Sequence, residues 1–339
     1  TPQSGSRTPL QLSPDALDWL VLNLARGLSR AELVQGLCDA GVPAATVVKT
    51  LDELRHSPLT AAYVRAVDQR ARARETRQLE RLVRHDEPAL LEVATCPAAD
   101  AFRQAHWLAN TPLIVRGYVQ QWPRPPRFDF QDLRNRFAEV EVDVVRGRNE
   151  FDRPDLQFGE LQTKMKFGEY VDLVLTTESN DTYLVARNRV VEQTEIGRLW
   201  DEIEPPGDLF RLPEHRGISL WLGPKGTHTK LHHDATNNFF CQVLGRKRVS
   251  LIAPAATFIA DAATGYYAAH STADVRRMDP TLVCDVELGP GDGLFIPVGW
   301  WHEVWSLSPS LSLAVVGFKW PNSYDYRPGR PLREREALG

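Results

Sequence analysis

The sequence predicts an α+β protein, in which an N-terminal helical bundle precedes a double-stranded β-helix, a jelly roll of two facing sheets. Two observations support this prediction. Residues 14–87 carry apolar side chains at helical spacing, whereas residues after 216 form short apolar stretches separated by glycine and proline. Apolar positions at i, i+3, i+4 and i+7 indicate amphipathic helices, and many short strands with turn residues between them are typical of jelly rolls.

The first hundred residues are expected to form a helical region, 1–100. Its expected helices cover residues 15–26, 30–40, 43–54 and 60–85. Ser29 stands three residues before Glu32, which is the pattern of a capping box at the start of the second helix. The fourth helix is rich in arginine, which could form a surface for an acidic partner or nucleic acid. Acidic residues interleave with the arginines, which favours a solvated helix face or an arm that mediates a homodimer.

The second region, 101–320, is expected to hold the β core, followed by a proline- and arginine-rich tail, 321–339. A helix is expected at 165–175 and short strands at 112–118, 140–145 and 182–186. The jelly-roll strands are expected at 217–223, 229–234, 239–244, 247–253, 284–288, 293–297, 303–306 and 311–318.

Bulk composition excludes several classes of protein. The net charge of -4 gives no global reason to expect nucleic-acid binding. No apolar run approaches the roughly 20 residues that a membrane span needs. The four cysteines are far apart in the sequence, which predicts reduced thiols and a cytoplasmic location rather than a disulfide framework.

The stretch His232-His233-Asp234 predicts a metal site. Side chains alternate along a strand, so His232 and Asp234 should face one side and His233 the other. One imidazole and one carboxylate supply two of the three ligands in the 2-His-1-carboxylate site that holds Fe(II). The best candidate for the third ligand is His302, which follows the glycine turn and apolar strand of residues 291–297.

Two nearby histidines, His228 and His233, are alternative candidates for metal ligands. His233 is expected to face away from the site, as a structural or surface residue. His228 has the parity of His232 if the strand is straight, and it is interpreted as a residue that lines the pocket and could touch substrate.

Two long motifs carry a specific resemblance. The stretches 226–248 and 291–302, with His232 and His302 roughly 70 residues apart, resemble the JmjC (cupin-like) Fe(II)/2-oxoglutarate-dependent oxygenases. Within that family the pattern is most similar to the asparaginyl hydroxylase that inhibits hypoxia-inducible factor. The resemblance implies Fe(II) held by His232, Asp234 and His302, with 2-oxoglutarate and O2 as co-substrates.

The resemblance also implies the residues that bind 2-oxoglutarate. The family's lysine for the distal carboxylate falls on Lys247, its threonine on Thr229, its asparagine on Asn238 and its tyrosine on Tyr183. Independently, strand alternation turns Lys247 inward, and a buried lysine needs an anionic partner. The chain departs from the pattern at Gly317, where the asparaginyl hydroxylase carries a second asparagine.

The expected function is hydroxylation of an amino-acid side chain in a protein or peptide, with succinate and CO2 as co-products. Three alternatives stay open at this point. The substrate could be a free small molecule or a natural-product peptide, the reaction could be demethylation of methyl-lysine, or the chain could be a non-catalytic metal-binding cupin that acts as a regulator. The sequence identifies neither the substrate nor the oxidised carbon.

Overall fold

The computed structural model describes residues 12–25, 28–60, 63, 90–151, 154–156, 160–185, 190–212, 217–256, 259 and 266–322. These residues form helices and β-sheets, so the α+β class is confirmed. The chain divides into two compact units, residues 1–85 and 86–339. The predicted boundaries near residues 100 and 320 stay predictions. Most of the expected helix at 60–85, and the tail from 323, lie outside the described residues.

The first unit contains three described helices, α1 (Pro14–Ala25), α2 (Arg30–Asp39) and α3 (Ala44–Arg55). They bury one small apolar cluster, formed by Leu20, Leu33, Leu37, Val47 and Leu51. The predicted capping box is present at the start of α2: the Ser29 side chain accepts from the Glu32 backbone, and the Glu32 side chain accepts in return.

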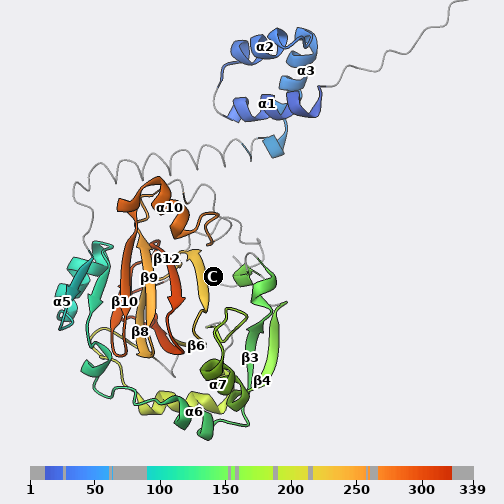
Figure 1. Cartoon of the computed structure of the whole chain (residues 1–339). Coiled ribbons are helices and arrows are strands. Elements are labelled where there is room, and N and C mark those ends of the chain that lie inside the picture. Colours follow the sequence, from blue (N-terminus) through green and yellow to red (C-terminus); the bar gives the residue numbers. More distant parts are fainter. Residues whose placement is uncertain are drawn as a thin grey trace, which may run out of the picture. The chain divides into compact units, whose positions relative to one another are not determined.

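The second unit is built on two larger sheets and one small one (Figure 1). The six-stranded sheet has the order β1-β2-β11-β8-β13-β6, and the four-stranded sheet has the order β10-β9-β12-β7. The small sheet has the order β4-β3-β5. All pairings are antiparallel except that of β1 with β2. The strands are β1 (Leu91–Val93), β2 (Leu113–Val115), β3 (Glu141–Arg146), β4 (Gln162–Lys166), β5 (Thr182–Tyr183), β6 (Ile218–Gly223), β7 (His228–His232), β8 (Asn238–Leu244), β9 (Lys247–Ile252), β10 (Cys284–Leu288), β11 (Gly293–Ile296), β12 (Trp301–Ser306) and β13 (Ser310–Val315).

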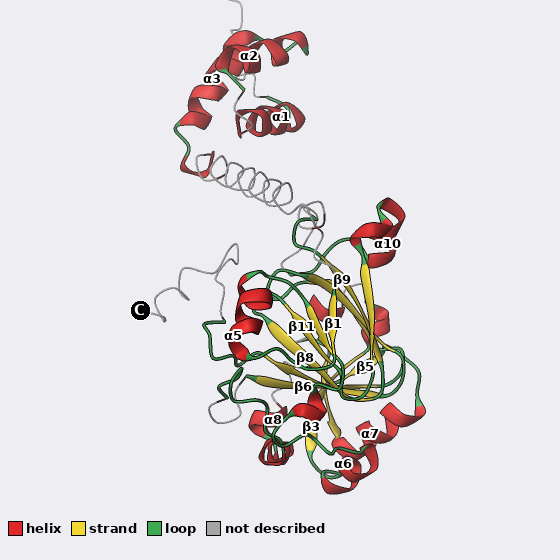
Figure 2. Ribbon diagram, turned by 90° about the vertical axis from the view of Figure 1, so that its left-hand side faces the viewer, coloured by secondary structure: helices red, strands yellow, loops and turns green. Residues whose placement is uncertain are grey.

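Helices lie at both ends of this unit. The helix α10 lies at one end of the strands, and α6 and α7 lie at the other, in both views (Figures 1 and 2). The longer helices and helical turns are α5 (Ala99–Phe102), η1 (Arg103–Leu108), α6 (Phe130–Arg136), α7 (Phe167–Thr176), α8 (Val190–Gln193), η6 (Glu195–Glu202) and α10 (Thr272–Met278). Short 3-10 turns occupy Val119–Gln121, Arg148–Glu150, Pro154–Leu156 and Pro280–Leu282.

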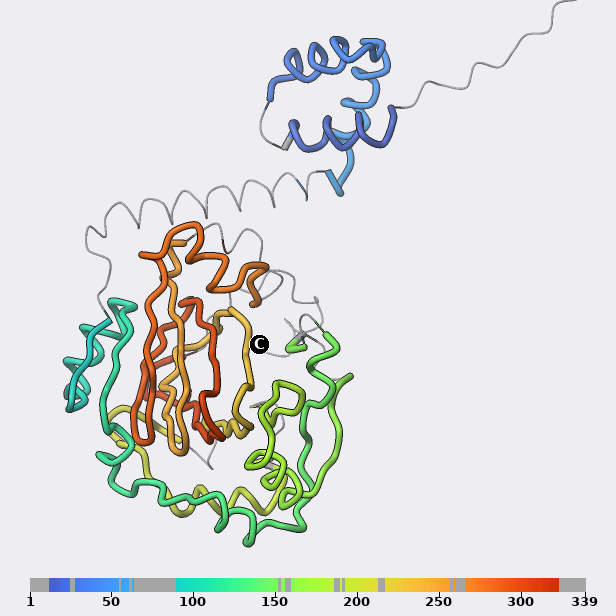
Figure 3. The backbone as a smooth tube through the Cα atoms, in the orientation of Figure 1, coloured from blue at the N-terminus to red at the C-terminus, as the bar shows by residue number. Residues whose placement is uncertain are grey.

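The main core lies on the six-stranded sheet. Phe102 of α5 packs its ring against Phe239 of β8 and Phe295 of β11, at centroid distances of 6.0 and 4.9 Å. The four-stranded sheet contributes a second cluster that includes Val249, Leu251 and Val304. Figure 3 shows how the backbone from β6 to β13, yellow to red, passes back and forth through both sheets. No described helix is long and apolar enough to cross a membrane.

Candidate metal centre

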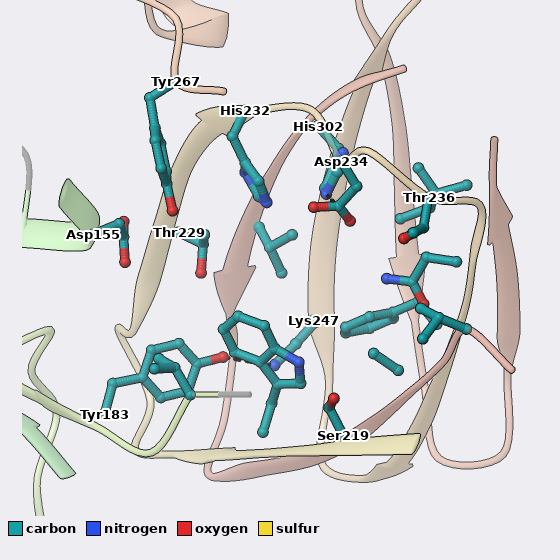
Figure 4. Close-up of a pocket in the computed structure, with 18 of the residues that line it drawn as sticks. Asp155, Tyr183, Ser219, Thr229, His232, Asp234, Thr236, Lys247, Tyr267 and His302 are labelled. Carbon is teal, nitrogen blue, oxygen red and sulfur yellow. Dashed lines mark hydrogen bonds and ion pairs between the residues drawn. The ribbon is translucent and has the colours of Figure 1, made fainter. Parts of the chain in front are cut away.

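A cavity is lined by strands of both larger sheets, and every predicted metal ligand and co-substrate residue lines it (Figure 4). His232 ends β7, and His302 is the second residue of β12. Asp234 follows β7 in a loop, not in a strand as alternation had suggested. The predicted co-substrate residues that line the same cavity are Thr229, Lys247, Asn238 and Tyr183.

The three predicted metal ligands converge. One ligand atom from each of His232, Asp234 and His302 lies within 4.8 Å of the others. The two imidazole rings are 4.1 Å apart at their centroids, and His302 Nε2 lies 3.8 Å from Asp234 Oδ2. Strand pairing explains this placement, because His302 stands directly opposite His232 in the β12–β7 register.

Hydrogen bonds to the backbone fix the tautomer of both histidines. His232 Nδ1 lies 2.8 Å from the Lys230 carbonyl, and His302 Nδ1 lies 3.0 Å from the Trp300 carbonyl. A carbonyl can only accept, so Nδ1 carries the proton in each ring and Nε2 keeps its lone pair. Burial first, and then the neighbouring His232, lower the pKa of His302 to about 4, so this ring is neutral near pH 7. Two imidazoles that turn Nε2 to the cavity, together with a carboxylate, fit a divalent metal.

A β-bulge in β7 overturns the parity expected for His228. Lys230 and Leu231 together stand opposite Glu303 alone, because His232 pairs with His302 while Thr229 pairs with Val304. Thr229 and His232 are three positions apart, so in a regular strand they would face opposite sides. The extra residue of the bulge brings both side chains to the cavity face.

The interpretation of His228 as a residue that lines the cavity is therefore wrong. Its side chain lies on the other face of the sheet, in a separate cleft, where its ring stacks on Trp305 at 3.5 Å and Nε2 lies 2.6 Å from Glu303 Oε1. His233 also points away from the cavity, as predicted, and its ring packs edge-on against Trp301 and Tyr266.

The inner end of the cavity presents a buried cation. Lys247 is only 1% exposed, and Nζ donates to the Tyr183 hydroxyl at 3.0 Å. Burial lowers the pKa of Lys247 to about 7, and no described carboxylate forms an ion pair with it. An ammonium group in such a place needs an anionic ligand, as the sequence had suggested.

Asn238 also faces the cavity, with its Oδ1 atom buried and without a hydrogen-bond partner. Asn237, the residue before Asn238, holds the loop that joins Asp234 to β8 through several hydrogen bonds. Asn322 Oδ1 accepts from the Asn237 backbone and side chain, and Asn322 Nδ2 donates to the carbonyls of Asn237 and Val316. Asn237 Oδ1 in turn accepts from the Val298 backbone. The loop that carries the carboxylate ligand is thus tied to two other segments.

Replacing Asn322 by alanine is expected to lower the free energy of unfolding by about 1–3 kcal/mol, since the buried groups of Asn237 lose their partners. The same substitution should weaken metal retention, because the loop after Asp234 is released. Urea unfolding and metal content after dialysis measure the two effects. Asn135→Ala, on exposed α6, is the matched control, and equal losses in both variants would contradict this role.

Among the lining residues that sequence reasoning missed are Arg148, Asp155, Trp221 and Tyr267. Arg148 and Asp155 come from outside the two motifs, in the segment after β3, so no motif spacing pointed to them. The Tyr267 ring stacks on His232 at 5.4 Å.

Gly317 lies against the backbone of Gly217. A Cβ built on Gly217 would lie 2.8 Å from the Gly317 Cα atom, and the Gly317 backbone hydrogen-bonds to Gly217. The two backbones approach closely where the resemblance had placed an asparagine. The effect of this departure on the site stays a prediction.

Comparison with known proteins agrees with this geometry. The model of the family described as "cupin-like domain" matches residues 98–325. The chain belongs to the cupin-like domain family. Among its relatives are proteins named for a JmjC domain, and the two histidines and one carboxylate of the cavity are the donor set that suits the Fe(II) of JmjC oxygenases.

Three relatives illustrate the similarity of this cupin-like chain. It is 31% identical over 237 residues to the lysine-specific demethylase JMJ30 of Arabidopsis thaliana, covering 66% of this chain and 53% of that protein. It is 29% identical to Jumonji C domain-containing protein 5 of Drosophila melanogaster, covering 66% and 58%. It is 24% identical to the bifunctional arginine demethylase and lysyl-hydroxylase psr-1 of Caenorhabditis briggsae, covering 68% and 64%. The chain thus spans somewhat over half the length of these relatives.

Proposed function

We propose that this chain is an Fe(II)- and 2-oxoglutarate-dependent oxygenase that hydroxylates an amino-acid side chain in a protein or peptide. One observation carries the proposal: the convergent His232, Asp234 and His302 share a cavity with the buried cation of Lys247. A metal site alone fits many functions. A metal site beside an unpaired buried lysine fits a co-substrate that must chelate the metal and also carry a distant carboxylate.

Each residue has a proposed role. His232, Asp234 and His302 hold Fe(II) on one face and leave the opposite face open. Lys247, with Tyr183 and Thr229 beside it, binds the distal carboxylate of 2-oxoglutarate, and Asn238 contacts the co-substrate nearer the metal. When bound, Fe(II) with 2-oxoglutarate and O2 supplies the oxidising chemistry, with succinate and CO2 as co-products.

The chain itself contributes binding, orientation and exclusion of water. The Trp300 and Lys230 carbonyls hold both imidazole rings in one orientation, which keeps each Nε2 aimed into the cavity. Lys247 and Tyr183 orient an elongated dicarboxylate, because Arg148, the other cation in the described lining, is already paired with Asp155. The aromatic side chains of Trp221 and Tyr267 keep the walls apolar between these polar groups.

Demethylation is the second candidate, because several relatives carry names that describe lysine or arginine demethylases. The products separate the two reactions. Hydroxylation adds the mass of one oxygen to the substrate, whereas oxidation of an N-methyl group releases formaldehyde and shortens the substrate by one methylene. A free small-molecule substrate and a non-catalytic metal-binding regulator are further alternatives, and the same measurements identify them.

The wider organisation belongs to the same proposal. The two larger sheets are those of a double-stranded β-helix, and α1, α2 and α3 belong to an N-terminal bundle that docks a macromolecular substrate. The proposal also includes a cytoplasmic location and a homodimer, both of which are expectations from the sequence alone. Sedimentation of the purified chain tests the dimer, and a monomer at micromolar concentration would exclude it.

The decisive experiment for the activity is turnover of 2-oxoglutarate. Purified protein with Fe(II), 2-oxoglutarate and O2 is expected to form succinate slowly even without a prime substrate, and faster when a suitable peptide is added. Absence of succinate with every peptide tested, while Fe(II) is demonstrably bound, would favour the non-catalytic regulator.

Binding of 2-oxoglutarate is expected to consume a proton above pH 7. In the free protein burial lowers the pKa of Lys247 to about 7 from an ordinary value of 10.5, so the amine is mostly neutral at pH 8. A carboxylate partner favours the ammonium form and raises this pKa again. Affinity for 2-oxoglutarate should therefore fall as pH rises through 7, by up to about tenfold per pH unit.

Calorimetry in buffers of different ionisation enthalpy measures this proton uptake directly. Lys247→Arg is the matched variant, because a guanidinium stays charged and its binding should take up no proton. Equal proton uptake in wild type and Lys247→Arg would show that another group titrates.

A further inference from the structure

The cavity contains one acidic side chain besides the proposed ligand Asp234, among the described residues that line it, and this is Asp155. Its side chain is only 9% exposed. Asp155 Oδ1 accepts from Arg148 Nη1 at 2.8 Å, whereas Oδ2 is buried and has no hydrogen-bond partner. An unpaired buried carboxylate oxygen is costly, so a ligand with a donor is needed to complete it.

Arg148 fixes the orientation of this carboxylate. The Arg148 side chain is 1% exposed, and its other nitrogens donate to the His228 carbonyl at 2.9 Å and to Asn180 Oδ1 at 3.4 Å. A guanidinium bound on three sides by acceptors cannot swing away to pair with Oδ2. The carboxylate of Asp155, which lines the cavity, is therefore held in place, and Oδ2 is its acceptor without a partner.

The co-substrate cannot satisfy this oxygen. At neutral pH 2-oxoglutarate carries two carboxylates and a ketone, all of which only accept hydrogen bonds. The donors that suit it are at the inner end, where Lys247 and Tyr183 lie. In Figure 4 Asp155 lies beyond Thr229, on the side of the cavity away from Asp234 and near Tyr267. The cavity thus offers donors to the co-substrate at one place and a fixed acceptor at another.

We propose that Asp155 is a specificity-determining residue that selects a substrate side chain ending in N–H groups. This inference rests on the proposed oxygenase function. The Arg148–Asp155 pair is neutral overall, and Oδ2 still carries part of the carboxylate charge, so it accepts a charge-assisted hydrogen bond. A side chain with only methyl or methylene groups leaves Oδ2 desolvated and unpaired, and a site built for hydrogen bonding rejects such analogues strongly.

The test compares peptide libraries with randomised flanks and one fixed central residue: arginine, lysine, glutamine or norleucine. Norleucine has nearly the length of lysine and no N–H group, so it is the apolar match. The readout is succinate formed with the library divided by succinate formed without it. Libraries with N–H groups at the centre are expected to raise this ratio in the wild-type chain at least about tenfold more than norleucine.

Asp155→Asn keeps the shape of the side chain and replaces the hydrogen-bond acceptor Oδ2 by an NH2 donor. Arg148 can only donate, so the Asn carbonyl must face Arg148 and its NH2 group then occupies the place of Oδ2. The ratio for the N–H libraries is expected to fall about tenfold or more, with the loss in KM for the peptide. Asp143→Asn, on β3 and outside the cavity lining, is the matched control and should keep the wild-type ratio.

The outcomes separate this inference from the proposed function. Succinate formation without preference for N–H libraries would overturn the role of Asp155 and leave the oxygenase intact. No succinate at all would overturn the oxygenase. If Asp155→Asn does not fold, the wild-type chain still tests the role of Asp155 through the comparison of the norleucine and lysine libraries. Equal stimulation of succinate formation by the two libraries would mean that Oδ2 binds only water, and would overturn the proposal.

Discussion

Asp234→Ala is expected to abolish both Fe(II) retention and succinate formation. Asp234 is the one carboxylate in the convergent set, and two imidazoles alone leave the metal without a hard anionic ligand. Loss of a residue that merely supports a ligand weakens metal binding by roughly 10–100-fold, so loss of the ligand itself should exceed about 100-fold. Metal content after dialysis and succinate yield are the measurements.

Asp143→Ala is the control, because Asp143 lies on β3 and does not line the cavity. Thermal unfolding of both variants separates loss of the site from loss of the fold. Since Asp234 lies in a loop after β7, its removal should leave the transition of the metal-free protein nearly unchanged. Succinate formation that survives Asp234→Ala would show that the metal ligands are assigned wrongly.

Lys247→Ala is expected to raise the 2-oxoglutarate requirement by more than about 100-fold, roughly 3 kcal/mol, because the distal carboxylate then lies in a buried place without a counter-ion. The Fe(II) requirement should change far less, since Lys247 is not a ligand. Titration of 2-oxoglutarate at saturating Fe(II), and the reverse titration, separate the two effects.

Lys247→Met keeps most of the buried volume and removes only the charge, so it distinguishes a lost ion pair from a cavity in the core. Arg248→Ala is the matched control from the next position in β9, whose side chain is exposed and lines the cleft on the other face. A parallel rise in the Fe(II) and 2-oxoglutarate requirements would mean that Lys247 supports the fold and not the co-substrate.

The sequence predicted much of the site because its key signals are local. The alternation of β9 turned Lys247 inward, and the structure agrees. His302 could be paired with His232 because each belongs to a long motif, and the register of β12 with β7 then places them opposite one another. The strands after residue 216 were recognisable from glycine and proline turns, and their observed bounds differ by only a few residues.

Other features depended on contacts that no local pattern records. The parity error at His228 arose from one additional residue in β7, and a bulge has no reliable signature in a single sequence. Arg148 and Asp155 reach the cavity through a buried ion pair in a segment without a motif. Asn322 stands in a stretch that reads as a polar tail, yet it binds the loop that follows Asp234.

Because of the bulge in β7, the spacing of two cavity residues in the sequence does not show that they share a face. Two residues separate Thr229 from His232, and only one separates their partners on β12. Deleting either of the two would remove the bulge, and Thr229 and His232 would then stand two positions apart and still share one face by simple alternation. A homologue without the bulge can therefore present the same two side chains to the cavity, and a single-residue gap at this point does not by itself indicate that the site is lost.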